Sequence, residues 1–188
     1  MVFNPARRAV ISEAALEVLG REGARAVTHR AVDAAAGVPQ GTCANYFSSR
    51  AELFAGMAER IFGLLEPDAV QLARLAALPL SEAEGEYVSH VVERLLRRPE
   101  LARALIELRL EASRNPDVSG ALSEFLRGGF QADVDFHESR GLAGGAQRVL
   151  LLHHLVNGII LDAVTISLSP DADPVALARR AARLLLAE

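Results

Sequence analysis

Three polar residues near the start of the chain, Gln40, Thr42 and Asn45, lie at spacings that place them on one face of a helix. The side-chain amides of Gln and Asn can each form two hydrogen bonds with adenine, and a hydroxyl can pair with several base edges. The same spacing turns Cys43 and Phe47, four residues apart, to the other side, where both would pack in a core. A helix divided in this way suits hydrogen bonding to bases in the major groove of DNA.

These residues belong to a short helix that we expect from about Pro39 to Tyr46. Another short helix precedes it in the chain. Thr28 is a candidate N-cap of that earlier helix, and Gly37 ends it, because glycine is common just past a helix C-terminus. The two helices and their turn of small residues form a helix-turn-helix pattern, in which the later helix enters the major groove. The flanking signals agree: Asn4-Pro5 begins a first helix that ends at Gly23, and Ser49-Arg50-Ala51-Glu52 is a capping box that begins a fourth.

Charge is distributed unevenly along the chain. Residues 1–50 contain six Arg and four acidic residues, whereas the other 138 residues contain 14 Arg and 20 acidic residues, and there is no Lys. A slightly basic head on an acidic body is compatible with DNA contact through the head alone. The asymmetry is mild and does not establish DNA binding by itself.

Several small motifs occur together in the first 54 residues: Thr28, Val32, Ala35-Ala36-Gly37-Val38-Pro39-Gln40-Gly41-Thr42, Tyr46-Phe47-Ser48-Ser49-Arg50 and Leu53. In these residues and their spacing the head resembles the tetracycline-repressor (TetR) family of regulators. Two departures stand out, because the family often has Leu-Tyr after the Gly-Thr pair and this chain has Cys43-Ala44. Cys43 still suits a core, but Ala44 removes a ring that typically contacts DNA.

The resemblance, together with the helical geometry, implies roles for eight residues. Three would contact phosphates, three would read base edges, one would let the backbone approach the duplex, and Arg30 would serve either role. For Thr28 alone, a helix cap is the more common role. The phosphate group is Thr28, Tyr46 and Arg50, the base-reading group is Gln40, Thr42 and Asn45, and the close approach is at Gly41.

The body, residues 55–188, reads as further helices, about nine in the whole chain, so the predicted fold is all-α with a DNA-binding head at 1–54. Asp68–Leu78 is a connector, and Ser81-Glu82-Ala83-Glu84 predicts a capping box. The helix Ala146–Leu168 is apolar nearly all round, so it needs cover on more than one side. A second copy of the chain is the natural cover, Gly158 would permit close approach, and we expect a homodimer.

The resemblance also implies a pocket for a small-molecule effector inside the body. Polar side chains on otherwise apolar helix faces are candidates: Arg109, His153 and Asn157. Satisfied core residues are the commoner explanation for each, and Arg109 could pair with a nearby Glu. His90 falls opposite the apolar face of its helix, so we expect it to be solvated.

Other functional classes find little support. His153 and His154 are adjacent and diverge on a helix, so we expect no metal site. There is no phosphate-binding glycine loop and no nucleophile motif, so we expect neither cofactor nor enzyme activity. The single cysteine, Cys43, fits a reducing cytoplasm, and no apolar run is long enough for a membrane span.

The favoured function is a sequence-specific regulator of transcription, a dimer on a palindromic operator. Release of DNA on binding a small apolar ligand is implied by the family, while activation or ligand-independent repression stays open. The alternative is a helical small-molecule-binding or partner-docking protein whose head binds DNA weakly. The lack of a ring at Ala44 is compatible with this alternative.

Overall fold

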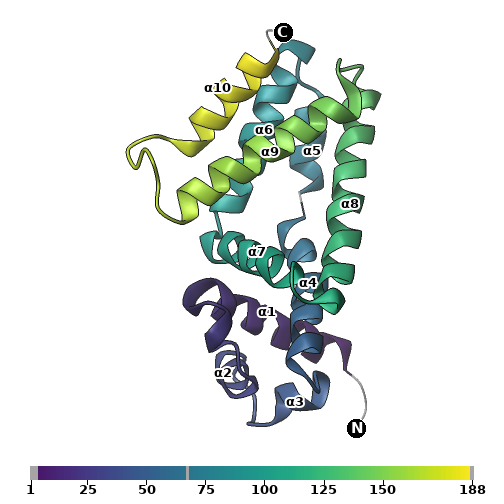
Figure 1. Cartoon of the computed structure of the whole chain (residues 1–188). Coiled ribbons are helices and arrows are strands. Elements are labelled where there is room, and N and C mark those ends of the chain that lie inside the picture. Colours follow the sequence, from purple (N-terminus) through teal and green to yellow (C-terminus); the bar gives the residue numbers. More distant parts are fainter. Residues whose placement is uncertain (1–3, 67, 187–188) are drawn as a thin grey trace. The chain divides into compact units, whose positions relative to one another are not determined.

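The computed structural model describes residues 4–66 and 68–186. Within these ranges the chain forms ten α-helices, one short 3-10 helix and no strand, so the all-α prediction is confirmed (Figure 1). The chain divides into two compact units. One contains the chain up to Leu65 together with Pro99–Phe125, and the other contains Glu66–Arg98 and the chain from Leu126 onward.

The first unit begins with a helix whose start and end follow its sequence signals. The side chain of Asn4 accepts a hydrogen bond from the backbone of Arg7, and Pro5 occupies the first helical position. Gly23 ends the helix with φ of 82°. The helices of this unit are α1 (Pro5–Glu22), η1 (Ala24–Ala26), α2 (His29–Ala35), α3 (Thr42–Tyr46), α4 (Arg50–Leu65), α7 (Pro99–Ala112) and the start of α8 (Pro116–Ser139).

Helix α1 packs against α2, α4 and α7 and organises the core of the first unit. Gly20 is required where α1 meets α7, because a Cβ there would lie 1.9 Å from the carbonyl oxygen of Glu100. Arg103 of α7 donates to the carbonyl of Gly20 at 2.9 Å and fixes the same crossing. The largest fully buried side chains of the unit include Ile11, Leu16, Leu19, Phe47, Phe54, Leu101 and Leu108.

The second unit is built around α6, which packs against α5, α9 and α10. Helix α5 was not predicted: Asp68 caps it by accepting a hydrogen bond from the backbone of Val70 at 2.7 Å, and Leu75 is its buried residue. Figure 1 shows α9 and α10 beside α6. The helices of this unit are α5 (Ala69–Ala76), α6 (Leu80–Leu96), the rest of α8, α9 (Gly145–Val164) and α10 (Pro174–Leu186).

Two predicted helix starts differ from the structure. Helix α3 begins at Thr42 and not near Pro39, because Gly41 has the left-handed φ of 90° and cannot continue a helix backwards. The predicted capping box Ser81–Glu84 is wrong: α6 begins at Leu80, directly after Pro79, without a side-chain cap. Its fourth residue, Glu84, is only 3 % exposed and serves another purpose.

The predicted end of the long helix at Leu168 is also wrong, because α9 ends at Val164. The carboxylate of Asp162 accepts hydrogen bonds from the hydroxyl of Ser167 at 2.6 Å and the backbone of Leu168 at 2.9 Å. These contacts hold the following residues in a loop, so the polar group inside the apolar run ends the helix early.

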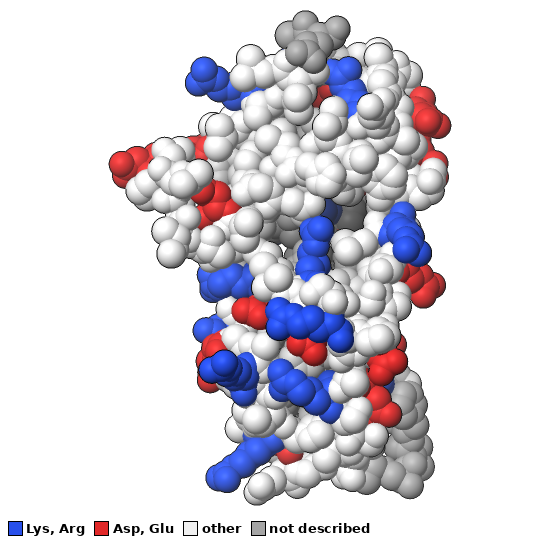
Figure 2. Space-filling model, in the orientation of Figure 1, with Lys and Arg blue, Asp and Glu red and all other residues white. Residues whose placement is uncertain are grey.

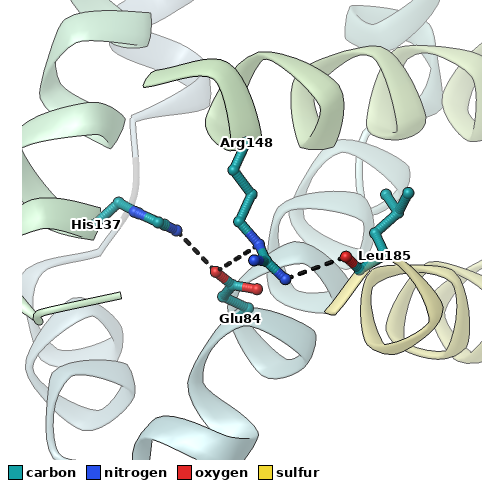
Figure 3. Close-up of polar contacts among 4 residues, drawn as sticks. All are labelled: Glu84, His137, Arg148 and Leu185. Atoms are coloured by element: carbon teal, nitrogen blue, oxygen red, sulfur yellow. Dashed lines mark hydrogen bonds and ion pairs between the residues drawn. The ribbon is translucent and has the colours of Figure 1, made fainter. Parts of the chain in front are cut away.

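A buried ionic cluster joins four helices of the second unit (Figure 3). Glu84 of α6 receives a hydrogen bond from Nε2 of His137 on α8 at 2.7 Å, and the same oxygen lies 3.3 Å from Nε of Arg148 on α9. Arg148 also donates to the carbonyl of Leu185 on α10 at 3.2 Å. A buried charge is unfavourable without partners. The cluster therefore favours helix positions in which Glu84 keeps its contacts with His137 and Arg148.

The compact units divide the chain differently from the predicted boundary between residues 54 and 55, since α4 runs through that point. The predicted division separates DNA binding from ligand binding and stays a prediction. Among the helices that the structure describes, none is both long and apolar enough to cross a bilayer.

Candidate DNA-binding surface

Helices α2 and α3 and the turn between them have helix-turn-helix geometry. Thr28 caps α2, because its hydroxyl oxygen accepts a hydrogen bond from the backbone of Ala31 at 3.2 Å. The turn contains Gly37 and Gly41 at φ of 62° and 90°, in the left-handed region that favours glycine. The predicted cap and the predicted end of α2 are therefore confirmed.

The two sides of α3 separate as the helical spacing predicts. Cys43 and Phe47 are buried, at 0 % and 1 % exposure. Gln40, just before the helix, and Asn45 on it are exposed, so their amide groups are available to a partner. Ala44, which stands where the family often has a ring, is exposed as well.

Thr42, Gly41 and Tyr46 are partly buried at the edges of this surface. The hydroxyl of Thr42 donates to the carbonyl of Pro39 at 2.5 Å. Since its single proton is used there, the hydroxyl would face a base edge as an acceptor. This restricts the predicted readout by Thr42 to base groups that donate, such as the amino groups of adenine and cytosine.

Asp33 is a functional candidate that the sequence reasoning missed. It lies on α2, is 3 % exposed, and its two carboxylate oxygens accept hydrogen bonds from the backbone of Gly41 at 2.7 Å and of Cys43 at 2.6 Å. The available signal was an acidic residue inside an otherwise apolar helical segment, one turn before the glycine turn. Burial, and then the charge of Asp33, raise the pKa of the Cys43 thiol to about 11.

Arg50, predicted to contact phosphate, has contacts inside the first unit. Its guanidinium donates to the carbonyls of Val27 at 2.7 Å and Ala24 at 2.6 Å, and it lies 4.5 Å from the ring centre of Phe54. Arg50 therefore connects the start of α4 to the segment before α2. The residue is exposed, and a guanidinium has five N–H groups, so donors remain for a phosphate.

The start of α4 forms the predicted capping box, and Glu52 also bonds to Ser48. Ser49 accepts a hydrogen bond from the backbone of Glu52 at 3.1 Å, as a capping box requires. The carboxylate of Glu52 accepts from the backbone of Ser48 at 2.7 Å and from its hydroxyl at 2.9 Å, and the backbone N–H of Ser49 interacts with the same carboxylate. These hydrogen bonds lower the pKa of Glu52.

Arg30, predicted to contact either phosphate or base, is exposed on α2. On the face drawn in Figure 2, arginine side chains alternate with acidic ones over the region where Figure 1 shows the helices of the first unit. Basic groups are thus interspersed with acidic groups on this face, in keeping with the mild charge asymmetry of the sequence.

The three predicted effector contacts lie in different settings. Arg109 is exposed on α7 in the first unit. His153 and Asn157 lie one turn apart on α9 of the second unit, where Asn157 is exposed and His153 is partly buried. His153 and Asn157 are therefore neighbours on one helix, whereas Arg109 belongs to the other compact unit.

His153 belongs to a polar network that the sequence did not reveal. Its Nε2 lies 2.9 Å from a carboxylate oxygen of Asp133 on α8, and its ring forms a T-shaped pair with the ring of Phe130, with 5.4 Å between centroids. The hydroxyl of Tyr87 on α6 donates to the other oxygen of Asp133. His153 is therefore hydrogen-bonded within the second unit while its side chain stays 36 % exposed, and its contact with a ligand stays a prediction.

The prediction that His90 is solvated was wrong, because His90 is only 8 % exposed. Helix α6 has neighbours on several sides, so the face opposite its apolar stripe is covered too. Burial lowers the pKa of His90, and the charge of Arg94 adds to this effect. The other charged groups that act on the ring are Glu93, Arg97 and Asp68.

Large apolar side chains remain exposed on α9 and α10. Leu151 and Leu161 on α9 are 51 % and 48 % exposed, and nothing lies within 4 Å of a Cβ built on Gly158. On α10 the buried residues are Ala178 and Ala182, whereas Leu177, Leu184 and Leu185 are exposed. Both helices therefore present apolar surface that one copy of the chain does not cover, and it comprises Leu150, Leu151, Leu161, Leu177, Leu184 and Leu185.

Among the residues that the structure describes, no group of three or more His, Cys, Asp or Glu is placed so that it could hold a metal ion.

Two family models match this chain. Residues 11–57 match the model described as bacterial regulatory proteins, tetR family, and residues 79–188 match the model described as tetracyclin repressor-like, C-terminal domain. A curated relative, the HTH-type transcriptional regulator BetI of Rhizobium meliloti (strain 1021), is 32 % identical over 129 residues. That match covers 66 % of this chain and 61 % of the length of the relative.

Solved structures share the fold over nearly the whole chain. The fatty acid degradation regulator FadR from Bacillus halodurans has a TM-score of 0.75 at 18 % identity, and the match covers 99 % of this chain and 97 % of that one. The multidrug binding protein EbrR, complexed with ethidium, has a TM-score of 0.72 at 23 % identity and coverages of 97 % and 99 %.

Proposed function

The chain belongs to the TetR family of transcriptional regulators, and we propose that a homodimer reads a palindromic operator through α3. Gln40 and Asn45 would read base edges, with Thr42 as an acceptor and Gly41 allowing close approach. Thr28, Tyr46 and Arg50 would hold phosphates, and Arg30 would contact either group. A transcriptional regulator is not an enzyme, so family membership agrees with the expected lack of catalysis.

One observation supports this proposal most strongly: exposed amides at Gln40 and Asn45 flank a helix whose other side, Cys43, is buried. The test begins with selection of DNA from a random pool by the wild-type protein, where we expect enrichment of a palindrome. Asn45→Ala should then weaken binding of that operator by about 1–3 kcal/mol per contact. Gln131→Ala, which removes an exposed amide from α8, is the matched control and should bind as the wild type does.

A second candidate function is a helical small-molecule-binding or partner-docking protein with weakened DNA readout. The exposed Ala44 favours it, because this side chain offers neither a ring nor a hydrogen bond to DNA. Failure of the random-pool selection to enrich any sequence would favour this candidate over the operator-binding regulator.

The exposed leucines of α9 and α10 support the homodimer. Exposed apolar patches of this kind commonly mark interfaces between proteins. We expect Leu151→Glu to convert the dimer to a monomer in light scattering at micromolar concentration. Leu110→Glu, a residue 50 % exposed on α7, is the control and should leave the dimer intact. A monomeric wild-type protein would contradict this part of the proposal.

The proposed regulation is repression relieved by a small apolar effector that binds the second unit near His153 and Asn157. An effector shifts DNA binding only if it has different affinities for the two states of the protein. The first probe is ethidium, which is bound in the EbrR complex. Thermal stabilisation by ethidium without DNA, reduced in His153→Ala, would support this site, and no stabilisation by ethidium would argue against it.

A further inference from the structure

The carboxylate of Asp33 bridges the two helices of the helix-turn-helix. Asp33 lies on α2, and its oxygens accept from the backbone amides of Gly41 and Cys43 at the start of α3. Both distances, 2.7 Å and 2.6 Å, are short for an N–H donor, as is typical when the acceptor is charged. The side chain is 3 % exposed, so water does not replace these bonds easily.

Helix α3 needs such a partner because of its own sequence. A helix leaves its first N–H groups without intrahelical acceptors, and a Ser, Thr, Asp or Asn at the N-cap normally satisfies one of them. Here the N-cap is Gly41, which takes φ of 90° and makes no side-chain cap. With only five residues, α3 has little stability of its own.

We propose that Asp33 is a positioning residue for DNA recognition, which sets the orientation of α3 and thereby the places of Gln40 and Asn45. This inference rests on the proposed function, in which α3 reads base edges. Asp33 does not itself touch DNA, because both its oxygens face the interior of the turn. Its contribution is to hold α3 in the binding-competent orientation before DNA arrives.

The expected effect follows from the loss of that preorganisation. When the competent state is only partly populated, the apparent dissociation constant rises by the inverse of its population. Loss of a cap, or of the acceptor for a buried amide, has effects that correspond to roughly tenfold in an equilibrium constant. We therefore expect Asp33→Ala to weaken operator binding about tenfold per recognition helix.

The ratio of the affinity for the operator to the affinity for unrelated DNA distinguishes a positioning role of Asp33 from a general effect on protein stability. Binding to DNA of unrelated sequence depends mainly on phosphate contacts, which tolerate a loosely held α3. We expect Asp33→Ala to weaken operator binding while its affinity for a scrambled duplex changes less than twofold, so that the ratio of the two affinities falls about tenfold or more. Asp33→Asn keeps one acceptor but turns an NH2 group toward the second amide, so its loss should lie between wild type and Asp33→Ala.

The experiment uses the full-length protein and the operator selected by the wild-type protein. Fluorescence anisotropy measures both duplexes for wild type, Asp33→Ala, Asp33→Asn and Glu52→Ala, at a temperature where melting curves show each to be folded. Glu52→Ala is the matched control, because it also removes a carboxylate that accepts a backbone amide in the same unit, outside α3. Hydrogen exchange by NMR reports the amides of Gly41 and Cys43 directly.

The expected result is a fall in discrimination in the order Asp33→Asn, then Asp33→Ala, with faster exchange at Gly41 and Cys43 and unchanged discrimination in Glu52→Ala. Unchanged discrimination in a folded Asp33→Ala protein would overturn the inference and leave the proposed function intact. An equal fall in Glu52→Ala would also overturn it, since general stability would then explain the effect. A wild-type protein that selects no sequence would refute the proposed function and this inference together.

Discussion

Replacing Arg50 with alanine tests a residue for which the sequence and the structure indicate different roles. The resemblance implies a phosphate contact, whereas the structure shows the guanidinium bound to the carbonyls of Val27 and Ala24 and resting on Phe54. The two roles are compatible, because two N–H groups serve the carbonyls and three are left. They affect different measurements, so one variant can examine both.

The magnitude of the structural role follows from the contacts. A hydrogen bond to a charged group contributes about 1.5–3 kcal/mol when well shielded, but Arg50 is exposed and solvent screening reduces this. We therefore expect a loss of about 1–2 kcal/mol for the two bonds together. For a chain of this length each kcal/mol lowers Tm by about 2–4 °C, which predicts a decrease of about 2–8 °C.

The phosphate role is measured by the dependence of operator binding on salt. Loss of one phosphate contact should reduce the slope of log K against log salt by about 1 for each subunit. Thermal melting by circular dichroism gives Tm, and anisotropy titrations at several salt concentrations give the slope. Arg30→Ala is the control for Tm only, because Arg30 is exposed on α2 and its removal should leave Tm unchanged.

Each role can be refuted separately. An unchanged Tm in Arg50→Ala would refute the connection between α4 and the segment before α2. An unchanged salt slope would refute the phosphate contact, even if operator binding became weaker, because a weaker fold would then explain the weaker binding.

Three further predictions concern buried groups. Glu84→Ala leaves a buried imidazole and a partly buried guanidinium without their carboxylate and should destabilise the protein by about 3–5 kcal/mol in denaturant titrations. The exposed Glu82→Ala should change stability by less than about 0.5 kcal/mol. Equal effects of these two variants would contradict the importance of the cluster. Burial lowers the pKa of His90 in the folded state, so the imidazole is protonated in the unfolded state first as the pH falls. The free energy of unfolding should therefore decrease as the pH drops below about 6.5. His90→Gln should reduce that decrease. Cys43, with its pKa raised to about 11, should resist alkylation by iodoacetamide at pH 8 in the folded protein and react on unfolding; rapid reaction of the folded protein would contradict its burial.

The local structure of the head could be read from its sequence because the signals act over a few residues. Asn4 and Thr28 cap their helices, Gly37 adopts a left-handed conformation, and the four-residue spacing of Cys43 and Phe47 places both in the core. Caps, glycine turns and helical periodicity depend on near neighbours in the chain. The all-α fold and the exposed amides of Gln40 and Asn45 follow from the same signals.

The partners of buried polar groups were decided by the tertiary structure alone. Glu84 has the spacing of a capping box but bonds to α8 and α9, and His90 lies off the apolar stripe but is covered because α6 has neighbours on several sides. In the sequence Asp33 is an ordinary helix residue. Only the folded turn places the backbone amides of Gly41 and Cys43 next to its carboxylate. A helical wheel shows which residues share a face, but the cost of burying a charge depends on groups far away in the sequence, which only the packed chain brings together.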